Sequence, residues 1–63
     1  MTQKELLYYE DAIGHESSII TILNDNLKLL ESEELKTFLE SEVDKHQTIK
    51  ENLITLLEEK ANE

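Results

Sequence analysis

The chain has 63 residues, with 15 Asp or Glu against six Lys, and a formal net charge of −9. It contains no Cys, Pro or Trp. The absence of Cys excludes a disulfide scaffold, a cysteine-ligated zinc finger and a thiol nucleophile. A chain with this net negative charge repels phosphate backbones and anionic lipid. No apolar run approaches the ~20 residues of a membrane span, and the N-terminus lacks a signal-peptide core. We therefore expect a cytoplasmic protein with neither a nucleic-acid nor a membrane partner.

The first predicted element is a helix over about residues 3–30. It starts at Thr2-Gln3-Lys4-Glu5, which fits a capping box. Apolar residues then recur in steps of three and four, which is the helical period. One polar residue, Glu16, interrupts this first stripe, which consists of Leu6, Tyr9, Ile13, Glu16, Ile20, Leu23, Leu27 and Leu30. Asn24-Asp25-Asn26 is a rival helix break, but the stripe continues through it, so two helices are favoured over three.

The second predicted element is a helix over about residues 33–60. Ser32 is a suitable N-cap, and Glu33 and Glu34 suit the positive end of the helix dipole. The stripe predicted here contains two polar residues, and its members are Leu35, Leu39, Glu42, His46, Ile49, Leu53 and Leu56. A short connection between two helices predicts an antiparallel hairpin.

The fold class is therefore all-α, with residues 1–63 as one helical-hairpin domain. The first helix carries a second stripe that one hairpin contact cannot cover: Tyr8, Ala12, His15, Ile19, Ile22 and Leu29. A stripe without a partner in its own chain predicts a partner from another copy. We expect a homodimer in which two hairpins form a four-helix bundle, with this second stripe as the dimer interface.

Three polar side chains on the stripes, Glu16, Glu42 and His46, are the candidate site residues. A turn centred on residues 32–33 places His46 level with Ile20, whereas a turn centred on residue 31 places it level with Glu16. Buried carboxylates need partners, so Glu16 is expected to pair with His46, within the chain or across the dimer. The favoured interpretation is a structural pair that fixes the register of the helices.

A metal site is the alternative for the same residues. Helical bundles bind iron or manganese through inward Glu residues and Glu-x-x-His pairs, and carboxylate with imidazole suits such ions. Here Glu42 and His46 are four residues apart rather than three, which still keeps them on one helical face. This alternative predicts Fe, Mn or Zn bound by Glu16, Glu42 and His46, whereas the favoured interpretation predicts no cofactor and no enzyme.

The segments Tyr8-Tyr9-Glu10-Asp11-Ala12-Ile13-Gly14-His15-Glu16, Glu34-Leu35-Lys36-Thr37-Phe38-Leu39-Glu40 and Glu42-Val43-Asp44-Lys45-His46 follow one another along the chain. Together they resemble the helix hairpin of ferritin-like proteins, in particular the rubrerythrin-like and spore-coat (CotF-type) branch. The resemblance implies Glu16 at the ligand position of the first helix. It does not preserve the Glu-x-x-His pair, because Val43 stands three residues before His46. It therefore implies a hairpin with a degenerate di-iron motif and a spore-associated role.

Three functions follow from these observations. The first is a non-enzymatic structural or protein-interaction module that acts as a homodimer, with any other protein partner unknown. The second is the metal-binding ferritin-like remnant. The third is an RNA-binding hairpin dimer like the plasmid regulator Rop, which rests on fold analogy alone. The third is disfavoured because the six Lys residues are interleaved with carboxylates and form no basic stripe.

Overall fold

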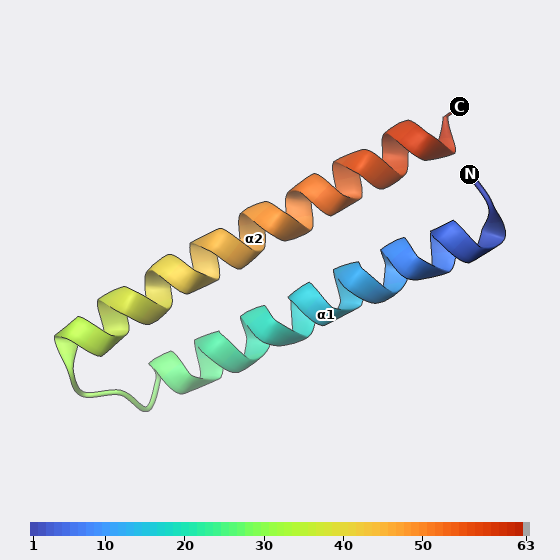
Figure 1. Ribbon diagram of the computed structural model, residues 1–63. Helices are drawn as coiled ribbons and strands as arrows, with labels where there is room; N and C mark the ends of the chain where they lie inside the picture. The colour runs from blue at the N-terminus through green and yellow to red at the C-terminus, as the bar shows by residue number, and fades with distance from the viewer. Residues whose placement is uncertain (63) are drawn as a thin grey trace.

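The computed structural model describes residues 1–62 and contains two helices, α1 (Gln3–Leu27) and α2 (Glu33–Ala61). The helices lie side by side and run in opposite directions, joined at one end, with the N-terminus and the end of α2 at the other (Figure 1). The hairpin measures 47 × 15 × 10 Å. The predicted all-α hairpin is therefore confirmed.

Both helices begin at the residues that the sequence indicates. The Thr2 hydroxyl accepts a hydrogen bond from the Glu5 N–H at 3.1 Å, and the Glu5 carboxylate accepts one from the Thr2 N–H at 3.1 Å. The hydrogen bond from the Thr2 N–H lowers the pKa of the Glu5 carboxyl, with a smaller contribution in the same direction from the Thr2 side chain. At the start of α2, the Ser32 hydroxyl accepts from the Leu35 N–H at 3.3 Å. Both caps satisfy amides that have no partner within the helix itself.

The first helix ends at Leu27, three residues before the predicted boundary at residue 30, while the second ends at Ala61, one residue beyond its predicted boundary. After Leu27 the hydrogen bonds join residues three apart instead of four, which is a tighter turn than an α-helix. The Leu29 N–H donates to the Asn26 carbonyl at 3.0 Å, and the Leu30 N–H donates to the Leu27 carbonyl at 3.4 Å. Poor helix formers at residues 24–26 explain why the helix ends here. They lie just before its end and do not divide the chain into three helices.

The contact surface of α1 is the first predicted stripe. Every member of that stripe is half-buried, from Leu6 to Leu30, including Glu16. Their three- and four-residue spacing keeps them on one side of the helix, toward α2. This part of the prediction is confirmed.

The contact surface of α2 differs from the predicted one. Leu39, Glu42, His46 and Leu53 are half-buried as expected, but three other members of the predicted stripe, Leu35, Ile49 and Leu56, are exposed. Their places in the contact are taken by the residues one position further along, which are Lys36, Lys50 and Leu57. Val43 and Ile54, which follow Glu42 and Leu53, are half-buried as well. The prediction was wrong about the rotation of α2. Lysine tolerates such positions because its aliphatic stem can cover apolar surface while its ammonium group stays in water.

A single hairpin leaves its interior incomplete. No residue in the range 1–62 is fully buried, and large apolar side chains remain exposed on both helices. Within the same range, neither helix contains a stretch apolar enough to cross a membrane. Two helices in contact along one line cannot enclose a side chain from all directions, so full burial requires further surfaces.

Candidate functional site

The central polar contact of the hairpin joins the two helices. Nδ1 of His46 on α2 lies 2.6 Å from Oε2 of Glu16 on α1. Because an ionised carboxylate only accepts hydrogen bonds, this geometry has the His46 Nδ1–H as donor. The side chains are 23% and 15% exposed, so the pair is partly shielded from water and its bond is stronger than one on an open surface.

This contact decides between the two registers that the sequence left open. With Glu16 level with His46, the hairpin folds about residue 31, and the predicted pairing occurs within one chain. Ile13 and Ile20 on α1 and Val43 on α2 are half-buried apolar neighbours of the pair, and the next contact position on α2 is Lys50. A polar pair among apolar neighbours favours one register, because a shift would separate the carboxylate from the imidazole.

The third candidate, Glu42, has a different partner. Its Oε1 accepts from the Lys45 ammonium at 3.2 Å, an ion pair between residues three apart on α2. Across residues 1–62 there is no group of three or more His, Cys, Asp or Glu side chains arranged to hold a metal ion. The chain thus brings two of the three predicted ligands together, and metal binding by Glu16, Glu42 and His46 stays a prediction.

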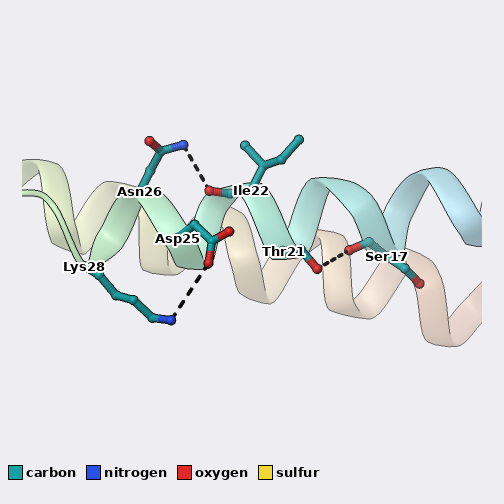
Figure 2. Close-up of polar contacts among 6 residues, drawn as sticks. All are labelled: Ser17, Thr21, Ile22, Asp25, Asn26 and Lys28. Carbon is teal, nitrogen blue, oxygen red and sulfur yellow. Dashed lines mark hydrogen bonds and ion pairs between the residues drawn. The ribbon is translucent and has the colours of Figure 1, made fainter.

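Hydroxyl and amide side chains on α1 bond to their own helix. The Thr21 hydroxyl donates to the Ser17 carbonyl at 3.1 Å, and the Asn26 amide donates to the Ile22 carbonyl at 3.0 Å (Figure 2). In the same view Lys28 and Asp25 form an ion pair at 3.8 Å. These are local contacts of a helix with itself, and none of them places a base next to a hydroxyl, as nucleophilic catalysis requires.

The predicted dimer interface lies largely open in the single chain. Tyr8, His15, Ile22 and Leu29 are exposed, while Ala12 and Ile19 are half-buried at its edge. Leu29 is the extreme case, with 79% of its surface exposed in the connection between the helices.

A second exposed apolar stripe lies on α2, and sequence reasoning missed it. It contains Leu35, Phe38, Ile49 and Leu56, and Phe38 is 60% exposed. Leu35, Glu42, Ile49 and Leu56 are spaced by seven residues, the repeat of a helix–helix seam. This heptad is the signal in the sequence for a second stripe, and it lies one position before the contact surface of α2.

The two exposed stripes lie on the same side of the hairpin. At about 100° per residue, the stripe on α1 and the stripe on α2 are each rotated by roughly a quarter-turn from the contact surface, in the same sense when each helix is viewed from its own N-terminus. Because the helices are antiparallel, equal rotations bring both stripes to one side. We name this side the apolar face, and its members are Tyr8, Ala12, His15, Ile19, Ile22, Leu29, Leu35, Phe38, Glu42, Ile49 and Leu56.

The opposite side of the hairpin is polar, and we name it the polar face. By the same geometry it includes Glu10, Ser17, Thr21, Asn24, Glu40, Gln47, Glu51 and Glu58, and one large apolar residue, Leu7, shares the helical position of Thr21. The Gln47 amide donates to the Glu51 carboxylate at 3.3 Å along α2. The hairpin is thus two-sided, with most of its exposed large apolar residues on one side of the line of contact between the helices.

Comparison with known proteins finds no matching family model, no similar curated protein and no solved structure that resembles the chain. The ferritin-like resemblance of the hairpin therefore stays a prediction from the sequence.

Proposed function

We propose that this chain is a non-enzymatic structural or protein-interaction module, and that it acts as a homodimer whose two hairpins form a four-helix bundle. The observation that carries the proposal is that the two helices are fully formed but enclose no hydrophobic core. No residue of the described chain is fully buried, although large apolar side chains are present on both helices. A domain of this size needs a larger core, and a second copy is the direct way to obtain it.

A binding role is also favoured by what surrounds the polar pair. Glu16 and His46 bond to each other between two helices, the arrangement of a register-fixing contact rather than of an acid–base pair open to a substrate. The metal-binding alternative rests on these two residues and lacks a third ligand in the described chain. A spore-coat location, which the sequence resemblance implies, would suit an assembly module equally well.

Sedimentation equilibrium of the purified chain tests the proposal. We expect the mass of two chains at protein concentrations of tens of micromolar and dissociation on dilution. The helical signal at 222 nm should melt at higher temperature as concentration rises, because a dimer is stabilised by mass action. Chelator should leave both measurements unchanged. A folded monomer throughout that range, or a melting temperature independent of concentration, would contradict the proposal.

A further inference from the structure

We propose that the dimer forms through the apolar face, so that the partner of this surface is the same surface of a second copy of the chain. This inference rests on the proposed function and adds the surface to it. The face draws on both helices and includes Leu35, Phe38, Ile49 and Leu56, which the sequence assigned to the contact within the hairpin.

Charge is the first reason for choosing a second copy. The chain as a whole carries −9, so two copies repel each other unless they meet where charge is low. Among the listed members of the apolar face, Glu42 is the one carboxylate, and it pairs with Lys45 at 3.2 Å, on the edge of the same face. Glu5 and Glu59 share helical positions with Ala12 and Phe38, but they lie at the terminal end of the hairpin. On the polar face, by contrast, carboxylates such as those of Glu10, Glu40 and Glu51 would face carboxylates of the second copy. Two apolar faces can therefore approach with less electrostatic repulsion than two polar faces.

Size is the second reason. The broad side of the hairpin is 47 Å long and 15 Å wide, of the same order as the ~800 Å² that each partner contributes to a standard protein interface. The exposed apolar residues extend over its whole length, from Tyr8 and Leu56 near the termini to Leu29 and Leu35 near the connection. A face of this length matches another hairpin better than a short peptide, which would leave part of it open.

Symmetry is the third reason. A two-fold axis lets one patch serve both subunits, so that a single sequence supplies both halves of the interface. Each hairpin presents two apolar stripes side by side, and stacking two such faces gives each helix a neighbour in its own chain and a neighbour in the other. This is the packing of a four-helix bundle, and it would enclose further the Glu16–His46 pair, whose side chains are already partly shielded in the single hairpin.

The test uses two residues of α1 with the same exposure. Ile22 on the apolar face and Leu7 outside it, on the side of α1 that is turned away from α2, are each 58% exposed. We expect Ile22→Glu to weaken dimerisation at least 100-fold in sedimentation equilibrium, because a carboxylate would be buried without a partner. Leu7→Glu, the matched control, should change the dissociation constant less than threefold. Equal effects of the two substitutions, or no effect of Ile22→Glu, would overturn the assignment of the face.

Accessibility gives a second measurement that does not depend on a disruptive charge. The chain has no cysteine, so Ile22→Cys and Leu7→Cys each introduce one unique thiol. In the dimer we expect a maleimide to modify position 22 at least 10-fold more slowly than position 7, with the difference lost on dilution to monomer. Equal rates in a sample of dimer mass would reject this face while leaving self-association intact. A wild-type chain that is monomeric would reject both proposals.

Discussion

Both helices contribute to each of the two broad sides of the hairpin, but the two sides differ strongly in polarity. On the apolar face, Tyr8, Ile22, Phe38 and Leu29 remain exposed, and the carboxylate of Glu42 pairs with Lys45. On the polar face, the exposed side chains of Gln47 and Glu51 bond to each other along the helix. Water solvates the second side at no cost, whereas exposure of the first forgoes the ~25 cal/mol per Å² gained on apolar burial. The difference indicates that the polar face is well solvated in the single chain, whereas the apolar face leaves large hydrophobic side chains exposed to water.

The largest expected effect on stability comes from shortening a side chain on the apolar face, compared with one on the polar face. Phe38→Ala should lower the free energy of unfolding by about 3 kcal/mol if the apolar face is covered, because a buried ring is replaced by a methyl group. Gln47→Ala, on the polar face, should change it by less than about 0.5 kcal/mol. Urea unfolding followed at 222 nm, at a concentration where the protein is dimeric, measures both. Similar small effects at the two positions would mean that neither face is covered.

An intermediate effect is expected at the line between the faces, where Glu16 meets His46. His46→Ala leaves the shielded carboxylate without its donor and should cost about 1–3 kcal/mol. The double variant Glu16→Leu/His46→Leu should recover most of this loss, since apolar residues can replace a buried polar pair. Lys45→Ala serves as the control, because its ion pair with Glu42 is more exposed and should contribute less than about 1 kcal/mol. A double variant less stable than His46→Ala would show that the pair does more than fix the register.

The smallest expected effect lies at the start of α1, away from both faces. Thr2→Ala removes the N-cap hydroxyl and should cost about 1 kcal/mol at neutral pH, measured by thermal unfolding. The pKa of Glu5 is lowered in the folded chain, so the contribution of its carboxylate is present above its ordinary value of 4.5 and is lost as the pH falls through the lowered one. Thr2→Ala keeps the backbone N–H that is the larger cause of this shift, so the pH dependence belongs to the Glu5 carboxylate and should be absent in Glu5→Gln. An equal loss of stability on acidification in wild type and in Glu5→Gln would contradict the capping box as its source.

Local features of the chain were predictable because they depend on residues close in sequence. The caps at Thr2 and Ser32 are such features, since each bonds to an amide three residues away. The contact stripe of α1 was also predictable, because its period is unbroken from Leu6 to Leu30. The end of α1 at Leu27 was less predictable, because the run of poor helix formers at residues 24–26 does not mark one residue as the boundary.

The sequence by itself thus determined that the protein is two capped, amphipathic helices with one polar residue, Glu16, on the contact side of α1. Only the tertiary structure decided the register and the rotation of α2. The connection has no Gly or Pro to fix its centre, so the Glu16–His46 contact had to select the turn about residue 31. On α2 two neighbouring stripes were both apolar enough to face α1, and packing placed Val43 and Leu57 inside and Phe38 and Ile49 outside. Periodicity cannot make that choice, because it fixes which residues share a side but not what that side faces.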